Sequence, residues 1–261
     1  EGFEGFRGNG GNDTMDGGAG FDRAQYDNAT VGVKVTLGGT SDGIAEIDGF
    51  GGTDVLRNIE EVRSGSGNDT LTGSDTGVFE SFEGRQGNDT IDGRGGVDRA
   101  NYQTSAAGVN VNLVTGTASD GWGGTDTLLN IENVRGSEFA DTLTGNAGNN
   151  DLEGRGGDDV IAGGAGNDTM RGGAGNDTLN GGSNPVNLGW ETSGNYSPSG
   201  DMVLYTEATS GVTIDLSADG LAGTATGGGV GTDTLIDVEF VIASNHDDVI
   251  RGGNRAGSEI V

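Results

Sequence analysis

The sequence predicts an all-β fold, a right-handed parallel β-roll or β-helix solenoid, from three observations. A nine-residue unit repeats five times without a break over residues 136–180. A longer unit lies over it, because aromatic, acidic and aliphatic residues of the first 37 positions recur 76 residues later. Glycine supplies 56 of the 261 residues and costs a helix about 1 kcal/mol at each interior position, which nearly excludes helix. Repetition on both scales is typical of a solenoid, and right-handedness follows from the general rule for parallel crossovers.

Each long unit alternates two kinds of segment. The nonapeptides, rich in Gly, Asn and Asp, predict a turn followed by a three-residue strand with one apolar side chain. Segments such as 31–37 and 109–113 alternate β-branched residues with small or polar ones, which predicts half-buried strands. A Gly-Thr-Asp-x-Leu motif marks each long copy, at residues 52–56, 124–128 and 231–235.

The repeats predict the domain organisation. Residues 1–182 form the roll, with two long units over about 3–92 and 93–182. Residues 183–200 hold both prolines and break the register, so we expect a loop insertion there. Residues 201–261 form a third, degenerate unit that continues the solenoid. The chain begins at Glu1 inside a repeat, and we expect it to be a fragment of a longer protein.

Two aromatic sets recur at equivalent positions of the long units. Tyr26, Tyr102 and Tyr205 precede the same strand in the three copies, which favours a repeated structural contact. We also assign four phenylalanines of the first two copies to the core. These are Phe3, Phe6, Phe79 and Phe82.

The charge balance restricts the partners. With 13 Lys and Arg against 41 Asp and Glu, the formal net charge is −28. Nucleic acid is excluded, because phosphate binding needs basic clusters that are absent, and anionic membrane is disfavoured equally. No apolar run predicts membrane insertion. Cysteine is absent and hydrophobic residues make up only 31% of the chain, so neither disulfides nor a large core can stabilise it.

The nonapeptide pattern predicts calcium sites. Glycine at positions one, two and four lets neighbouring turns approach, and Asp at position six adds a charged oxygen. If two units make one coil, Asp141, Asp159 and Asp177 stack at about the 4.8 Å strand spacing and repel by about 3.5 kcal/mol per pair at a dielectric of 20. A hard divalent ion between turns reverses this repulsion, and mixed carboxylate and carbonyl oxygens suit Ca²⁺ better than Mg²⁺. The lack of Cys and the single His argue against zinc and copper.

Eleven candidate units begin at residues 8, 17, 64, 84, 93, 136, 145, 154, 163, 172 and 243. Ten of them carry Asp at position six, and these are Asp13, Asp22, Asp69, Asp89, Asp98, Asp141, Asp159, Asp168, Asp177 and Asp248. The eleventh has Asn150 there, so the following Asp151 is its candidate ligand. We expect folding to be coupled to calcium binding.

These units resemble the RTX, or repeats-in-toxin, family, since five consecutive copies keep glycine, acid and apolar residue in phase. The resemblance implies a β-roll with several Ca²⁺ ions between stacked turns, type I secretion, and folding in calcium-rich surroundings. It also implies that carbonyl oxygens of the first four positions join the Asp as ligands. Carried onto two units, this role falls on Gly163, Ala165, Gly172 and Gly175.

Three function classes are open. The first is a calcium-stabilised structural module of a secreted bacterial protein of surface-layer or adhesin type, extracellular or at the cell surface. The second is the non-catalytic C-terminal portion of a secreted protease, lipase, polysaccharide-modifying enzyme or toxin. The third, an enzyme on a β-helix, is disfavoured because the acids occupy repeat positions that calcium explains, so we predict no catalytic residue. Besides calcium, the candidate partners are neighbouring copies and cell-surface glycans.

Single aromatic and basic residues add little to these classes. Trp122, Trp190 and Tyr196 are able to stack on sugar rings, although packing under a loop is the commoner role of such residues. His246 is expected to face solvent in a turn.

Overall fold

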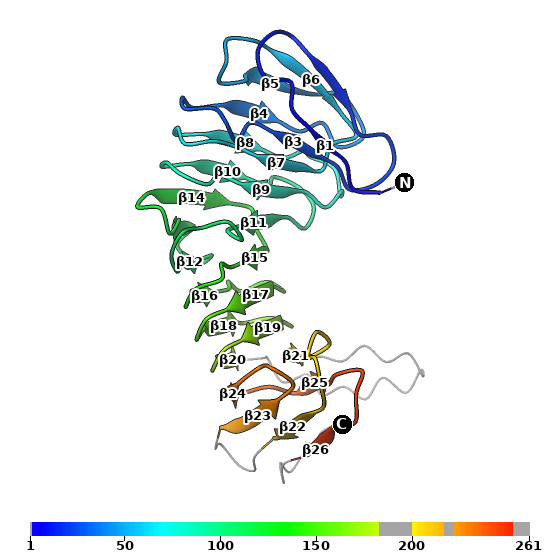
Figure 1. The fold of residues 1–261 in the computed structure, drawn as a ribbon, viewed down its shortest axis with the longest axis vertical. Helices are drawn as coiled ribbons and strands as arrows, with labels where there is room; N and C mark the ends of the chain where they lie inside the picture. The colour runs from blue at the N-terminus through cyan, green and yellow to red at the C-terminus, as the bar shows by residue number, and fades with distance from the viewer. Residues whose placement is uncertain (1, 183–199, 217–221, 253–261) are drawn as a thin grey trace. The chain divides into compact units, whose positions relative to one another are not determined.

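The computed structural model describes residues 2–182, 200–216 and 222–252, which divide into two compact units, 1–135 and 136–261. Figure 1 shows β-strands and connecting turns, and the described residues contain no helix. No helix long and apolar enough to cross a membrane therefore occurs in this part of the chain. The predicted all-β class is confirmed. Residues 183–199 of the expected insertion, with Trp190 and Tyr196, lie outside the described residues.

In the first unit, the strands form two sheets. Sheet A is parallel throughout, in the order β1 (Gly5–Phe6), β3 (Arg23–Gln25), β7 (Glu61–Arg63), β9 (Ser81–Glu83), β11 (Arg99–Asn101) and β15 (Asn133–Arg135). Sheet B runs β2 (Thr14–Asp16), β6 (Asp54–Arg57), β5 (Gly43–Ile47), β4 (Lys34–Thr36), β8 (Thr70–Thr72), β10 (Thr90–Asp92), β14 (Thr125–Leu129), β13 (Thr117–Ser119) and β12 (Asn110–Asn112).

The second unit has the same two kinds of sheet. Its sheet A is the parallel series β17 (Asp151–Gly156), β19 (Thr169–Ala174), β21 (Met202–Leu204) and β25 (Phe240–Ile242). Its sheet B runs β16 (Thr142–Thr144), β18 (Val160–Gly164), β20 (Thr178–Gly182), β24 (Thr232–Ile236), β23 (Gly223–Gly227), β22 (Val212–Asp215) and β26 (Val249–Arg251).

The nonapeptide array winds as the period predicts. Leu143 pairs with Ile161 and Ile161 with Leu179, each 18 residues further along the chain. All three side chains are completely buried, as are Leu152 and Met170 in sheet A. Each three-residue strand thus contributes one apolar side chain to a narrow core between the sheets.

Sheet B departs from a purely parallel solenoid at three places. The triplets β4-β5-β6, β12-β13-β14 and β22-β23-β24 are antiparallel, and each belongs to one long repeat. Their outer strands are those expected from the β-branched segments and the Gly-Thr-Asp-x-Leu motifs, whereas the middle strand was not expected. Consecutive strands joined by a short turn pair antiparallel, because a parallel partner requires a crossover.

The assignment of four phenylalanines to the core is wrong for two of them. Phe82 is completely buried, but 57% of Phe3 and 36% of Phe79 are exposed. The Phe3 ring packs under the Arg23 guanidinium, 4.8 Å from the ring centre, and the Phe79 ring lies 5.7 Å from that of Phe21. These two rings precede a strand instead of occupying its inward position.

Candidate metal centre

The side-chain carboxylates of the position-six aspartates accept hydrogen bonds from main-chain amides of the preceding coil. The amide N–H of Asp141 donates to Oδ1 of Asp159 at 2.8 Å, and that of Asp159 donates to Oδ1 of Asp177 at 2.9 Å. The Asp177 amide continues the series to Asp233 at 3.1 Å. We call such a series a carboxylate ladder. It forms because Asp141, Asp159 and Asp177 directly precede strands of sheet B and Asp233 lies at the start of β24, so the parallel register stacks these residues in successive coils.

A second ladder precedes sheet A in the same unit. Asn150 N–H donates to Asp168 Oδ1 at 2.8 Å, Asp168 N–H to Asp201 Oδ1 at 2.9 Å, and Asp201 N–H to Glu239 Oε2 at 2.9 Å. The first unit repeats both arrangements. Its amide-to-carboxylate pairs are Asp13 to Asp54, Asp69 to Asp89, Asp89 to Asp126, Glu4 to Asp22, Asp22 to Glu60, Glu80 to Asp98 and Asp98 to Glu132.

The second oxygen of many of these carboxylates is buried and has no hydrogen-bond partner in the structure. Such oxygens belong to ladder residues of both units, namely Oδ2 of Asp13, Asp22, Asp69, Asp89, Asp98, Asp159, Asp168 and Asp177, and Oε1 of Glu80. A buried carboxylate oxygen without a partner is strongly unfavourable. Its recurrence at equivalent positions indicates a shared ligand instead of isolated defects.

The unpaired oxygens face main-chain carbonyls of the next coil. A Cβ atom placed on Gly154 would lie 2.1 Å from Asp159 Oδ2 and 2.7 Å from the Gly172 carbonyl oxygen. On Gly163 it would lie 2.4 Å from Asp168 Oδ2 and 2.8 Å from the Gly181 oxygen. Gly154 and Gly163, the first residues of their units, therefore each leave a small space bounded by a carboxylate and a carbonyl oxygen. This donor set, oxygen only and partly anionic, fits Ca²⁺.

Burial makes the ladder charges costly in the absence of a cation. Desolvation is the main cause that raises the pKa of Asp89 and of Asp159 to about 8, and neighbouring carboxylates raise it further. Desolvation also raises the pKa of Asp98 to about 7, and that of Asp168 and Asp177 to about 6. A bound divalent ion would favour the charged form of each group.

The assignment of Asp151 as a ligand needs correction. Asn150 itself is buried at the ladder position, and its Oδ1 accepts the Asn146 amide at 2.8 Å. Asp151 begins β17 one residue later, so its side chain faces away from the ladder and forms an ion pair with Arg171. The Gly163 oxygen lies beside Asn150, since a Cβ on Gly145 would be 2.1 Å from it and 2.4 Å from Asn150 Oδ1.

The remaining predicted ligands fall into two groups. The structure places the Gly163 and Gly172 carbonyls beside ladder side chains, whereas a ligand role for Ala165 and Gly175 stays a prediction. Asp248 joins a ladder at β26, where its Oδ1 accepts the Val212 amide at 2.8 Å and the Ser244 hydroxyl at 2.7 Å. The hydrogen bond from Ser244 lowers the pKa of Asp248, which is half-buried, whereas most of the other ladder aspartates are buried.

Sequence reasoning missed the ladder members outside the nonapeptides. They are Asp54, Asp126, Asp201 and Asp233 among the aspartates, and Glu60, Glu132 and Glu239 among the glutamates. A signal was present, because most of them stand two residues before an inward apolar residue, as position six does in a nonapeptide. The spacing between the acid and the apolar residue is therefore a better guide to a ladder position than the glycine pattern.

In three of these aspartates, the second carboxylate oxygen accepts a hydrogen bond from a tyrosine hydroxyl. Tyr26, Tyr102 and Tyr205 donate their hydroxyls to Oδ2 of Asp54, Asp126 and Asp233 at 3.0, 3.1 and 2.9 Å. The expected repeated structural contact is confirmed. Burial raises the pKa of each tyrosine well above its ordinary value, so the hydroxyl remains a donor.

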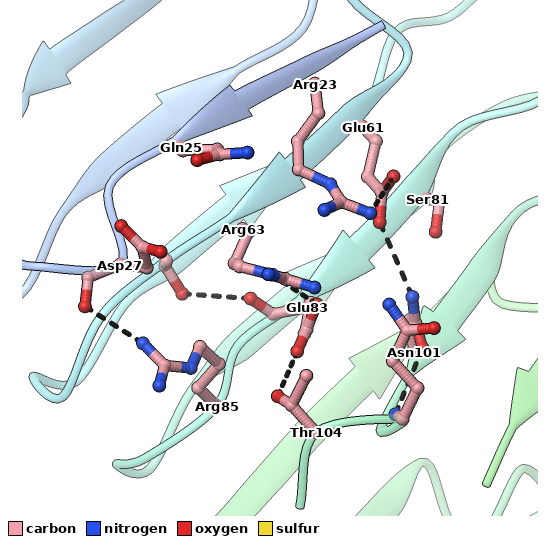
Figure 2. A network of polar contacts seen from close by, with 12 residues as sticks. Arg23, Gln25, Asp27, Glu61, Arg63, Ser81, Glu83, Arg85, Asn101 and Thr104 are labelled. Carbon is pink, nitrogen blue, oxygen red and sulfur yellow. Dashed lines mark hydrogen bonds and ion pairs between the residues drawn. The ribbon is translucent and has the colours of Figure 1, made fainter. Parts of the chain in front are cut away.

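Arginine neutralises a different set of acids, on the outward side of sheet A. Figure 2 shows Arg23 pairing with Glu61 at 2.9 Å and Arg63 with Glu83 at 2.6 Å, while Thr104 also donates to Glu83. Glu61 and Glu83 are only 2% and 0% exposed, yet both are paired. Buried acids of this chain are thus matched by arginine where arginine can reach them.

Side chains alone would not complete a metal site. In the described ranges, no three or more His, Cys, Asp or Glu side chains gather as a metal-binding group. Main-chain carbonyls lie beside ladder carboxylates at Gly154 and Gly163, and we expect them to supply a large part of the coordination. His246 is exposed, as expected.

Comparison with known proteins agrees with this geometry. The model of the RTX calcium-binding nonapeptide repeat matches residues 6–24, 59–75, 79–101, 130–161 and 153–184. No curated protein matches the chain. RTX nonapeptide repeats bind Ca²⁺ between turns, and several repeats imply several ions. The chain carries calcium-binding nonapeptide repeats of the RTX family, folded as a β-roll.

Proposed function

We propose that this chain is a calcium-stabilised structural module of a secreted bacterial protein, of the surface-layer or adhesin type. The observation that carries the proposal is the repeated carboxylate oxygen, buried and unpaired, beside a carbonyl of the next coil. Calcium there joins one coil to the next, so repetition lengthens the module without requiring a larger hydrophobic core.

Folding that requires calcium is compatible with export of the chain in an unfolded state. A chain of net charge −28 with unneutralised ladders stays unfolded where calcium is scarce, and it folds after type I secretion into calcium-rich surroundings. We expect dissociation constants for calcium of about 10⁻⁴–10⁻³ M, the range of extracellular calcium modules. The site residues proposed to bind calcium are the ladder aspartates of the nonapeptides, with the carbonyl oxygens of Gly163, Ala165, Gly172 and Gly175.

Titration of metal-stripped protein tests the proposal. Far-ultraviolet circular dichroism and size-exclusion chromatography should show an expanded chain becoming compact and β-rich as calcium rises. Magnesium at the same ionic strength serves as the control and should act weakly. A chain that is equally compact and β-rich without metal would refute a calcium-dependent module.

Light scattering of the folded protein tests the surface-layer role. Acidic faces of neighbouring copies repel unless a divalent ion joins them, so calcium beyond that needed for folding should drive association. A chain that stays monomeric, and that binds neither bacterial surfaces nor their glycans, would favour the rival role as the non-catalytic part of a secreted enzyme or toxin. The rest of the open reading frame then decides, because that role requires a catalytic domain in the same polypeptide.

A further inference from the structure

A seven-residue turn recurs outside the nonapeptides. It reads Asp-Gly-Phe-Gly-Gly-Thr-Asp at 48–54 and Asp-Gly-Trp-Gly-Gly-Thr-Asp at 120–126. In each case it connects the middle and last strands of an antiparallel triplet, β5 to β6 and β13 to β14. Both turns lie outside every segment that the RTX repeat model matches.

The first acid of each turn is completely buried. One oxygen, Oδ1 of Asp48, accepts the amides of Phe50, Gly51 and Gly52 at 2.7, 2.8 and 2.9 Å. In the second copy, Asp120 Oδ1 accepts the three equivalent amides at 2.8, 2.9 and 2.8 Å. The other oxygen, Oδ2, is buried without a partner in both residues. The amide contacts hold that unpaired oxygen in a fixed direction.

The unpaired oxygen faces a carbonyl of an adjacent nonapeptide turn. A Cβ placed on Gly52 would lie 2.7 Å from Asp48 Oδ2 and 1.6 Å from the Gly11 carbonyl oxygen. On Gly124 it would lie 2.7 Å from Asp120 Oδ2 and 1.8 Å from the Gly87 oxygen. The carboxylate and carbonyl oxygens thus lie close together beside each glycine, an unfavourable arrangement unless a cation or a proton occupies the space between them.

Further negative charge surrounds each space. Asp13 and Asp89, which belong to the adjoining nonapeptides, also have a buried, unpaired Oδ2. The charges of Asp13 and Asp48 both raise the pKa of Asp54, and that of Asp120 raises the pKa of Asp126. Desolvation is the larger cause in both cases. No arginine or lysine pairs with Asp48 or Asp120 among the described contacts, since the Oδ1 atoms bind amides and the Oδ2 atoms have no partner.

The third copy provides an internal comparison. Its turn reads Gly-Gly-Gly-Val-Gly-Thr-Asp, so Gly227 stands where the other copies have Asp48 and Asp120. The carbonyl is kept, because a Cβ on Gly231 would lie 2.0 Å from the Gly175 oxygen. The tyrosine contact to Asp233 is kept as well. These two contacts therefore form without the acid.

We propose that the turns 48–54 and 120–126 each bind one further calcium ion, between Asp48 Oδ2 and the Gly11 carbonyl in one copy and between Asp120 Oδ2 and the Gly87 carbonyl in the other. These ions join an antiparallel excursion to the neighbouring nonapeptide turn. The third copy does not bind such an ion, because Gly227 brings no carboxylate.

A proton is the physical rival of the ion. A protonated Asp48 would donate its O–H to the Gly11 carbonyl and satisfy both oxygens. Asparagine imitates this state, since its amide NH₂ donates in the same direction without carrying charge. Asp48→Asn and Asp120→Asn therefore separate the two explanations.

The experiment counts bound calcium per full-length chain by elemental analysis after equilibrium dialysis at saturating calcium. Each single variant should bind one ion fewer than the wild type, and the double variant two fewer, with an unchanged β signal in circular dichroism. Asp75→Asn is the matched control, because the Asp75 side chain is 84% exposed, and it should bind as many ions as the wild type. If the asparagine variants keep the full count of ions, the proposal is overturned and the buried acids are protonated.

Crystals of the wild-type chain with calcium provide a test that needs no variant to fold. Anomalous scattering should place an ion beside Asp48 and Gly11 and another beside Asp120 and Gly87, and none beside Gly227. Ions at the nonapeptide turns but none at these two positions would overturn the proposal independently of the asparagine variants.

Discussion

Two kinds of aspartate stand in the same ladders and differ in one contact. Asp126 and Asp159 both accept a main-chain amide of the preceding coil on Oδ1, at 3.0 and 2.8 Å. On Oδ2, Asp126 also accepts the Tyr102 hydroxyl, whereas Asp159 has no partner there. Burial raises the pKa of Asp126 to about 7 and that of Asp159 to about 8, and the tyrosine hydroxyl works against the rise only in Asp126.

The difference shows where a side chain can replace an ion. Each tyrosine directly follows a sheet A strand and begins a long connection to the next strand of sheet B, as Tyr102 does between β11 and β12. A nonapeptide has only a tight turn and a short strand, with no position from which a bulky donor could reach the ladder. Asp141 is an exception, because its Oδ2 accepts the Ser137 amide at 2.6 Å. Where no such donor lies within the turn, as at Asp159, we expect the second carboxylate oxygen to depend on a cation.

Removal of calcium should cause the largest loss of structure, and it should affect the aspartates without a tyrosine partner most. We expect a chelator to abolish most of the β signal, because each nonapeptide ladder loses the charge that offsets its buried carboxylates, and three tyrosine contacts cannot hold the fold alone. Circular dichroism with a calcium back-titration measures this. Persistence of the nonapeptide strands in the chelated chain, seen by hydrogen exchange, would contradict it.

A change of pH should have the next largest effect, on the stability of the folded state of the metal-free chain. Folded-state pKa values of about 6 to 8 lie above the ordinary aspartate value, so the folded chain binds protons more tightly than the unfolded chain. The resulting stability is fully present below about pH 4 and is lost as the pH rises through 6 to 8. Metal-stripped protein should therefore form more β structure at pH 5 than at pH 8, which circular dichroism measures.

Calcium should reverse that trend, because the ion competes with the protons. Its affinity should rise between pH 6 and 8, and titration calorimetry in buffers of different ionisation enthalpy should detect proton release on binding. Affinity that stays constant across this range would mean that the ladder carboxylates are already charged without metal.

The sequence predicted the repeating parts of the fold well. The 18-residue coil, the single inward side chain per strand and the stacking of Asp141, Asp159 and Asp177 all follow from a local period, because parallel register simply copies one coil onto the next. The middle strand of each antiparallel triplet could not be predicted in this way. Its place in sheet B depends on partners such as β4 and β6, and no period encodes that pairing.

The candidate site was predicted in part for a similar reason. Glycine and Asp at fixed positions predicted the nonapeptide aspartates that the structure places in the ladders, but Asp151 was chosen for its charge although Asn150 holds the ladder position. Glu60 was missed because its neighbours are not glycine-rich, and Asp126 was missed because its Gly-Thr-Asp-x-Leu motif was taken only as a marker of the long repeat. Stacking depends on the register of the strand that follows, and that register is set by the inward apolar residue.

Substitution of one glycine should break a single calcium site. In Gly154→Ala, the new Cβ would meet Asp159 Oδ2 at 2.1 Å and the Gly172 oxygen at 2.7 Å, so it would occupy the space between two proposed ligands. We expect the loss of one ion and destabilisation by about 1–3 kcal/mol, the usual range for overpacking. Gly77→Ala is the control, because a Cβ there meets no atom within 4 Å. Equal calcium content and unfolding temperature in the two variants would argue against this space as the ion's position.

The tyrosine contact should have the smallest effect overall, because its removal lowers stability without the loss of an ion, and it separates the two kinds of aspartate most directly. Tyr102→Phe removes the donor to Asp126 Oδ2 and leaves a buried carboxylate oxygen unpaired, which we expect to destabilise the calcium-bound chain by about 1–3 kcal/mol. Combining it with Asp126→Asn gives a double-mutant cycle in chemical unfolding, and a coupling energy should appear because the two groups act through one hydrogen bond. A coupling energy near zero would mean that Asp126 has another partner for Oδ2. In that case an ion would serve both kinds of aspartate, and the tyrosine would contribute packing alone.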